Sequence, residues 1–322
     1  MSEPTLSLRE WRDGDEVTVA DALGPAGSPQ VALSRALLGP ATQQPWRRTV
    51  VAEADGAIVG AAAVSESSLH PDRLWLYTEV LPAHRRRGVG TALVGALREE
   101  VPPSGTSGLR TRYPVNPELS ENFEESETSA AAPFAASIGL IPIQRSRLVV
   151  VAPESLAVPP FGPTGPTLED LATGSVELTK AVAAFYDAVH APWDRSEMTL
   201  GRAQDHLLAP ATGARGAVVL RDRPKEAGGR ILSFAVSYDP AVTDPTEAQD
   251  APTEVLLGYD TDLDPARARG AVHNLLAMLV ARYPVQLEID DAMEPLAAVV
   301  TGLLNAGSAH IEAETEIAAT PA

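Results

Sequence analysis

The sequence contains no cysteine. Disulfide bonds, thiolate metal sites and a cysteinyl acyl-enzyme are therefore excluded, and any acyl transfer must use another nucleophile or proceed directly. No apolar stretch has the length that a membrane helix needs, and the first residues show no basic region followed by an apolar run. We therefore expect a cytoplasmic protein that does not bind membranes.

Basic residues are few relative to acidic ones. The chain has 25 Lys and Arg against 43 Asp and Glu, which gives a net charge of −18. Such a charge opposes nonspecific binding to nucleic acid or anionic membranes, so we predict neither partner. Two interpretations of the acidity stay open, namely solubility and the attraction of cationic substrates.

The length of 322 residues suggests two domains.

One stretch of the chain changes its hydrophobic period. Residues 74–80 alternate between apolar and polar side chains, which predicts a half-buried strand, and residues 89–101 carry apolar side chains at helical spacing. The loop between them contains Arg85-Arg86-Arg87-Gly88-Val89-Gly90. Glycines at the first turn of a helix let a phosphate approach backbone N–H groups at the positive end of the helix dipole. The loop therefore predicts a ligand that carries phosphates.

The glycine spacing excludes two common phosphate loops. A Walker loop needs Gly-x-x-x-x-Gly-Lys-Ser/Thr, and a dinucleotide fingerprint needs a third glycine where this chain has Leu93. The remaining pattern, Arg/Gln-x-x-Gly-x-Gly after a strand that ends in Val-x-Pro, resembles motif A of the GCN5-related N-acetyltransferase (GNAT) family. The resemblance implies that this turn holds the pyrophosphate of acetyl-CoA and that the strand end pairs with the pantetheine arm. The implied binding residues are Thr78, Glu79, Val80, Arg85, Arg86, Arg87, Gly88, Val89, Gly90 and Thr91.

A second part of the resemblance lies further along the chain. Phe134 and Gly139 match motif B of the family, of the type Phe-Tyr-x-x-x-Gly-Phe, and Leu140 replaces the last aromatic residue. Ala135 stands where the family often has a tyrosine that protonates the departing CoA thiolate. The segment before this motif is acidic, and it either borders the acceptor entrance, as in the family, or is a solvated loop. Its glutamates are Glu118, Glu121, Glu124, Glu125 and Glu127.

The second half of the chain repeats the order of elements expected in the first, which indicates an internal duplication. Residues 153–170 are rich in proline and glycine and are interpreted as a linker. We therefore expect an α/β (α+β) fold of two tandem GNAT domains, each with a mixed central sheet flanked by helices. Residues 1–152 form the domain with the intact acetyl-CoA loop, and residues 171–322 form a degenerate copy.

The loop of the second copy differs from the first at the positions that matter for phosphate. Asp264 is predicted to cap a helix that has Pro265 at its first position, and its carboxylate would occupy the place of a phosphate. Val272 replaces the second glycine of the pattern that begins Arg267-x-x-Gly270. We therefore predict that CoA does not bind in this turn.

The implied function is transfer of an acetyl group from acetyl-CoA to the primary amine of a small, cationic acceptor. Without cysteine, the amine would attack the thioester directly in a ternary complex, with a strand N–H near Val80 polarising the carbonyl. Glu79 is the candidate catalytic base; alternatively it pairs with one of Arg85 to Arg87 or faces solvent. His70, in a polar turn, is either a second base or a surface histidine. No metal is predicted.

A function from another class also fits the pattern, namely a non-catalytic CoA-binding or regulatory protein, which the missing motif B tyrosine favours. The tandem layout also resembles mycothiol synthase, a two-domain member of the family in which the second domain is the competent one. In this chain the first domain carries the intact loop. An oligomeric state does not follow from any of these patterns.

Overall fold

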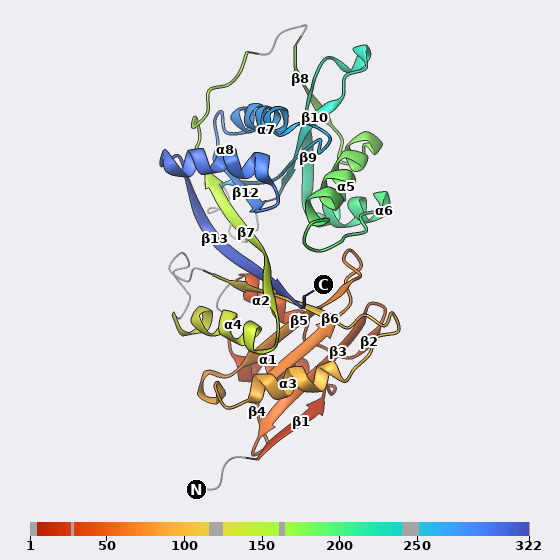
Figure 1. Cartoon of the computed structure of the whole chain (residues 1–322), viewed down its shortest axis with the longest axis vertical. Coiled ribbons are helices and arrows are strands. Elements are labelled where there is room, and N and C mark those ends of the chain that lie inside the picture. The colour runs from red at the N-terminus through yellow and green to blue at the C-terminus, as the bar shows by residue number, and fades with distance from the viewer. Residues whose placement is uncertain (1–4, 27–28, 116–124, 161–164, 240–250, 322) are drawn as a thin grey trace. The chain divides into compact units, whose positions relative to one another are not determined.

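The computed structural model describes residues 5–26, 29–115, 125–160, 165–239 and 251–321 (Figure 1). The chain divides into two compact units. Unit 1 comprises Met1–Ile143 and Thr315–Ala322, and unit 2 comprises Gln144–Glu314. Apart from the two-residue strand Thr42–Gln43 and short helical turns, the described residues of both halves repeat the order of one strand, two helices, three strands, a helix, a strand, a helix and a strand. The expected α/β fold with mixed sheets is therefore confirmed.

Unit 1 is built on a mixed sheet in the order β1-β3-β4-β5-β6-β13, in which only β5 and β6 are parallel. The short strand β2 pairs with β3. Its strands are β1 (Leu6–Glu10), β2 (Thr42–Gln43), β3 (Trp46–Ala54), β4 (Ala57–Ser65), β5 (Arg73–Val80), β6 (Gly108–Pro114) and the end of β13 (Ala309–Ala319). Its helices are α1 (Asp15–Leu23), α2 (Pro29–Arg35), α3 (Val89–Arg98) and α4 (Glu125–Ser137).

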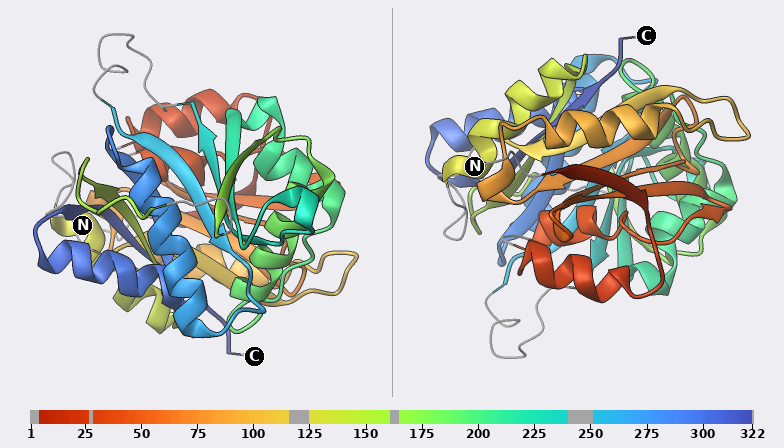
Figure 2. Two further views of the ribbon diagram at one scale, coloured as in Figure 1. Left: turned by 90° about the horizontal axis from the view of Figure 1, so that it is seen from above. Right: turned by 90° about the horizontal axis from the view of Figure 1, so that it is seen from below.

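The helices of unit 1 cover both faces of this sheet. One apolar cluster joins β4 and β5 to α3, with Leu76 and Leu93 among its buried members, and a smaller one on the other side joins Val51 and Ala61 to Val19 of α1. Figure 2 (right) shows α3 on one side of the strands and α1 with α2 on the other. Because side chains alternate along a strand, each face of β5 meets a different layer of helices.

Unit 2 has the strand order β7-β12-β11-β10-β9-β8, in which only β11 and β12 are parallel. Its strands are β7 (Ile141–Val151), β8 (Thr167–Leu171), β9 (Ala214–Arg221), β10 (Ile231–Tyr238), β11 (Thr253–Tyr259) and β12 (Val285–Asp290). Its helices include α5 (Val176–His190), α6 (Leu200–Ala203), α7 (Pro265–Leu279) and α8 (Glu294–Asn305). None of the described helices of either unit is both long and apolar enough to cross a membrane.

The chain crosses between the units at two strands, which shifts the boundaries from those predicted. Residues 146–151 of β7 pair with β12 in unit 2, and residues 315–319 of β13 pair with β6 in unit 1. Each unit thus completes its sheet with the last strand of the other half of the sequence. Both exchanged strands are buried where they pair, since Val149 and Val151 and, in unit 1, Ala318 and Ala319 are all 0 % exposed. In addition, residues 167–170 of the predicted linker belong to β8.

Candidate functional site

The candidate site lies where β5 ends and α3 begins. A short turn at Pro82–His84 follows the strand, Arg86 has a φ of 60°, and Gly88 has a φ of 82° at the N-cap of α3. A left-handed conformation costs an L-residue about 1–2 kcal/mol, so Gly88 suits this position. A Cβ atom built on Gly88 would meet nothing within 4 Å. The backbone at Gly88 is therefore accessible to a ligand.

The first turn of α3 has no side-chain cap from the described residues. Its N–H groups are thus left for solvent or an anion, at the positive end of the helix dipole. Arg86 and Arg87 beside it are exposed, whereas the Nε of Arg85 donates a hydrogen bond to the Val80 carbonyl at 2.9 Å. Arg85 therefore ties the turn to the strand, and Arg86 and Arg87 supply positive charge at its surface.

Gly90 makes room for a neighbouring side chain, a role that the glycine pattern of the sequence did not indicate. A Cβ atom on Gly90 would lie 3.0 Å from Cε2 and 3.1 Å from Cζ of the Phe134 ring. The glycine therefore allows α4 to pack against the first turn of α3. The two sequence motifs meet at this contact. The neighbouring residues of the same turn divide by exposure, with Val89 buried and Thr91 exposed.

The strand before the turn presents an open edge, defined here as residues 76–80 of β5. The parallel pairing with β6 ends at Trp75 and Arg110, while residues 76–80 stay paired with β4 on the other side. The Leu81 N–H donates to the Val59 carbonyl of β4 at 2.9 Å. Since successive N–H groups of a strand point to opposite edges, those of Thr78 and Val80 point to the open edge.

Thr78 adds an unsatisfied polar atom to this edge. Its Oγ1 atom is buried and has no hydrogen-bond partner among the described residues. A buried hydroxyl without a partner costs about 1–3 kcal/mol and indicates a place where a ligand can satisfy it. The open edge therefore offers backbone N–H groups and one hydroxyl to an extended, polar chain.

Glu79 lies on the opposite face of β5, where it forms a cluster with Arg35 and Tyr77. Arg35 of α2 donates to both carboxylate oxygens, at 2.6 Å from Nη2 and 2.8 Å from Nε, and the Tyr77 hydroxyl donates at 2.5 Å. The Glu79 side chain is 16 % exposed, so it is reachable from outside. Its partner is Arg35, and not one of Arg85 to Arg87 as one interpretation of the sequence had it.

The cluster fixes the protonation of the two neighbours of Glu79. Burial raises the pKa of Tyr77 above its ordinary value, and the Glu79 carboxylate raises it further. The hydrogen bonds to Glu79 likewise raise the pKa of Arg35. Tyr77 therefore stays a neutral phenol that donates a hydrogen bond, and Arg35 stays a cation.

Sequence reasoning missed two members of this cluster. Tyr77 could have been found, because residues i and i+2 of a strand share a face. Arg35 could not, because it lies 44 positions from Glu79 and no sequence pattern links the two residues. The open edge of β5 also needs the observed pairing with β6 to be recognised.

Ala135, His70 and the acidic segment before motif B are the remaining predicted positions of unit 1. Ala135 is 2 % exposed and offers no hydroxyl in the place of the family tyrosine. His70 is 5 % exposed, so the interpretation as a surface histidine is wrong. Glu118, Glu121 and Glu124 lie outside the described residues, as do the side chains of Glu125 and Glu127.

The corresponding turn of unit 2 is helical. As predicted, Asp264 caps α7 by accepting a hydrogen bond from the Arg267 N–H at 3.0 Å, and Pro265 occupies the first position. Gly270, the counterpart of Gly88, lies inside the helix. The N-terminus of α7 thus carries a protein carboxylate where α3 has no side-chain cap.

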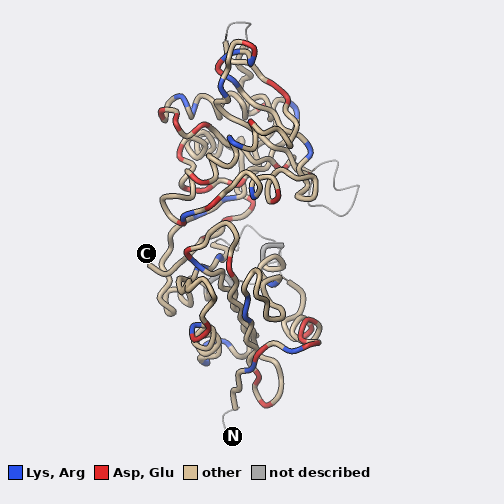
Figure 3. Tube along the Cα trace, turned by 90° about the vertical axis from the view of Figure 1, so that its right-hand side faces the viewer, with Lys and Arg blue, Asp and Glu red and all other residues tan. Residues whose placement is uncertain are grey.

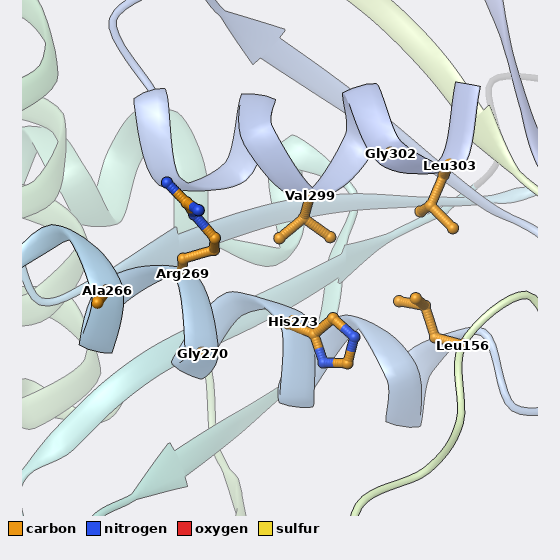
Figure 4. A pocket seen from close by; sticks show the side chains of 8 residues that line it. All are labelled: Leu156, Ala266, Arg269, Gly270, His273, Val299, Gly302 and Leu303. Carbon is orange, nitrogen blue, oxygen red and sulfur yellow. The ribbon is translucent and has the colours of Figure 1, made fainter. Parts of the chain in front are cut away.

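The two units can also be compared in the distribution of their charges and in the space between their last two helices. Figure 3 shows acidic residues along both units with basic residues among them. In unit 2 a pocket of about 540 Å³ lies between α7 and α8, where Val299 and Leu303 face Leu156 and His273 (Figure 4). In unit 1 the equivalent helices α3 and α4 meet at Gly90 and Phe134.

Comparison with known proteins identifies the family of the first unit. Residues 45–139 match the model of the acetyltransferase (GNAT) domain, a range that includes β5, the glycine turn, α3 and the contact with Phe134. The chain therefore contains a domain of the GNAT family, as its motifs predicted. A stretch of 71 residues is 41 % identical to L-2,4-diaminobutyric acid acetyltransferase from Nocardia farcinica. That match covers 21 % of this chain and 37 % of the relative.

Solved structures support the tandem layout of the fold. A GCN5-related N-acetyltransferase from Sphaerobacter thermophilus superposes with a TM-score of 0.57 and 15 % identity, covering 98 % of this chain and 95 % of its own. A tandem GNAT protein from the clavulanic acid biosynthesis pathway gives 0.58 and 16 %, covering 99 % of this chain and 100 % of its own. Both units thus correspond to parts of a known two-domain fold.

Proposed function

We propose that this protein is an N-acetyltransferase that transfers the acetyl group of acetyl-CoA to the primary amine of a small, cationic acceptor. The observation that carries the proposal is the combination of an open strand edge with the uncapped, glycine-bearing start of α3. Together with the GNAT domain, these features suit a ligand with an extended polar arm and phosphates. Unit 1 is then the catalytic unit.

The residues of unit 1 fit acetyl-CoA on two counts. The backbone from Gly88 to Thr91, with Arg86 and Arg87 beside it, can hold the pyrophosphate, since the helix start is uncapped and the space at Gly88 is open. The N–H group and the hydroxyl of Thr78 can pair with the amides of the pantetheine arm. Arg85 holds the turn against the strand by donating a hydrogen bond to the Val80 carbonyl.

Glu79 is the proposed proton acceptor of the reaction. The attacking amine must lose a proton, and a carboxylate beside the strand end can take it directly or through water. Arg35 and Tyr77 keep that carboxylate in one orientation through their hydrogen bonds. The N–H of Val80 is the proposed donor to the developing oxyanion, because it points to the open edge. With no cysteine, the amine attacks the thioester without an acyl-enzyme.

The proposed acceptor class rests on charge and on one relative. The name of the Nocardia farcinica relative specifies a small diamine amino acid as the acetylated compound. The net charge of −18 raises the local concentration of cations and disfavours nucleic acid. Added salt should therefore raise the acceptor KM as the Debye length falls from about 10 Å at 0.1 M. A KM that is independent of salt would remove this electrostatic argument.

Unit 2 is proposed to be a degenerate copy that does not bind CoA in its turn. Asp264 caps α7, and the residues that correspond to the glycine turn are helical. A phosphate would meet a carboxylate in place of free N–H groups. We further propose a cytoplasmic protein without membrane or nucleic-acid partners, in keeping with the charge.

A second candidate function, a CoA-binding protein without catalysis, is favoured by the buried Ala135 in motif B. One experiment separates the two. Release of free CoA from acetyl-CoA is measured with a panel of small diamines, amino sugars and neutral amines, followed by mass spectrometry of the products. Turnover with cationic amines and intersecting double-reciprocal plots support the enzyme. Binding of acetyl-CoA without turnover of any amine would support the alternative.

A further inference from the structure

The structure assigns a second small-molecule site to unit 2: we propose that a pocket beside α5 binds a free amino acid with an apolar or aromatic side chain. This pocket, called the α5 pocket below, lies among α5, the start of β10 and the end of β11 and has a volume of about 410 Å³. Ligand pockets typically measure about 300–1,000 Å³, so an amino acid fits with room to spare. The proposal does not depend on the function proposed for unit 1.

The room in the α5 pocket comes from small residues on the helix. Ala181 and Ala184 of α5 line it at positions where larger side chains would fill the space. Phe234 and Tyr259, which line the pocket from the sheet, are 1 % and 6 % exposed and pack with Phe185 at ring distances of 5.6 and 5.1 Å. The wall on the side of the sheet is therefore apolar and aromatic, and suits an apolar side chain.

The charged residues of the pocket fall into two classes. The first is already neutralised within the protein, because Asp260 pairs with Arg230 at 2.6 Å and Glu177 pairs with Arg221 at 2.6 Å. The second comprises Lys180 of α5 and Asp262, which follows β11. Among the described residues neither of these two side chains has a hydrogen-bond or ion-pair partner, and both are exposed at the pocket.

One free cation and one free anion at a pocket with an aromatic wall match a zwitterion. The ammonium group of the ligand would meet Asp262 and its carboxylate would meet Lys180, while its side chain enters between the alanines and the aromatic wall. A purely cationic ligand would leave Lys180 without a partner, and a purely anionic one would leave Asp262. The neutralised pairs on either side keep the net field small, so both ends of a zwitterion are accepted.

The test is a calorimetric titration of the full chain with L-phenylalanine and L-leucine. Phenethylamine, which lacks the carboxylate, and 3-phenylpropionate, which lacks the amine, serve as matched probes. We expect an amino acid to bind at one site per chain. Ala184→Leu should fill the pocket and weaken binding by about tenfold or more. Ala188→Leu, at an exposed alanine of the same helix that does not line the pocket, should leave it unchanged.

Two further variants change the exposed charges of the pocket, and because both side chains are exposed, these variants should fold normally. Asp262→Asn should weaken the binding of L-phenylalanine and phenethylamine but not of 3-phenylpropionate. Lys180→Gln should weaken the binding of L-phenylalanine and 3-phenylpropionate but not of phenethylamine. Binding should persist in Glu79→Gln, which alters only the proposed site of unit 1. The proposal is overturned if neither amino acid binds at millimolar concentration, if Ala184→Leu and Ala188→Leu behave alike, or if Glu79→Gln abolishes binding.

Discussion

Gly88 and Gly90 are two positions apart, yet they support the candidate site in different ways. Gly88 adopts a left-handed conformation beside open space, whereas Gly90 makes room for the Phe134 ring. The sequence pattern predicts a phosphate turn at both. It could not show the second role, because that role depends on a residue 44 positions later that only the packing of α4 on α3 brings near.

The packing role of Gly90 predicts a change in stability. Gly90→Val should lower the free energy of unfolding of unit 1 by about 2 kcal/mol, because the new side chain overlaps the Phe134 ring. Adding Phe134→Ala should recover about 1 kcal/mol relative to the sum of the two single changes. Gly95→Val is the control, since Gly95 lies in the same helix and its Cβ would meet nothing within 4 Å. Equal stability of the Gly90 and Gly95 variants in urea would contradict the account.

Glu79 carries the kinetic prediction at this scale. Glu79→Gln should lower the acetylation rate near neutral pH by about 100-fold, with partial recovery as the pH rises and the amine deprotonates unaided. The pH profile separates this role from a structural one, which would not recover. Glu100→Gln, at a carboxylate that pairs with Arg48 at 3.6 Å, is the control. An unchanged rate in the Glu79 variant at every pH would leave Glu79 without a catalytic role.

At the scale of the elements, the spacing of hydrophobic residues correctly predicted β5 as a strand and α3 as a helix. Residues 74–80 and 89–101 were expected as strand and helix, and β5 spans Arg73–Val80 and α3 spans Val89–Arg98. However, the spacing of hydrophobic residues carries information about one element and not about which elements pack together. It therefore could not predict that β5 leaves β6 after Trp75, or that α2 brings Arg35 to Glu79.

The N-terminus of α1 gives a prediction with a defined pH dependence. Arg9 of β1 donates to both oxygens of the buried Asp15 at 2.6 and 2.9 Å, and this pairing holds the pKa of Asp15 below its ordinary value of 3.8. A lowered pKa in the folded state contributes stability above the ordinary value, and this contribution is lost as the pH falls through the folded value. The carboxylate thus fastens α1 to the sheet at neutral pH.

Asp15→Asn should therefore lower the free energy of unfolding by about 2 kcal/mol near pH 7. The difference from the unmodified protein should shrink as the pH falls below the ordinary value of 3.8 and through the lower pKa of the folded state, because Asp15 then gains a proton in both states. Urea unfolding of unit 1 across this range provides the measurement. Asp13→Asn, at an exposed aspartate of the same loop, should change little. A difference that is constant with pH would show that the Asp15 charge is not the cause.

The whole molecule is organised by the exchange of closing strands between its two halves. The repeat of elements predicts two similar units, and the fold of the solved tandem GNAT structure agrees with that. The sequence could not reveal which sheet each closing strand joins, because β7 and β13 are both apolar enough to fit either. As a result, residues 315–319 complete the sheet of unit 1.

Deletion of residues 315–322 should therefore affect unit 1. It removes the antiparallel partner of β6 together with the buried Ala318 and Ala319, so amide exchange in β6 should accelerate and acetyl-CoA affinity should fall. Deletion of residues 321 and 322 alone should have little effect. Unchanged exchange in β6 after the longer deletion would contradict the pairing of β6 with β13.

The central claim, that unit 1 alone binds acetyl-CoA through its glycine turn, is tested most directly by calorimetric titration of the full chain with acetyl-CoA. The account predicts one equivalent per chain, abolished by Gly88→Asp because a carboxylate would face the pyrophosphate. Binding should persist in Gly14→Asp, at another left-handed N-cap glycine beside open space, and in Gly270→Asp of α7. Two equivalents per chain, or one that survives Gly88→Asp, would contradict the account.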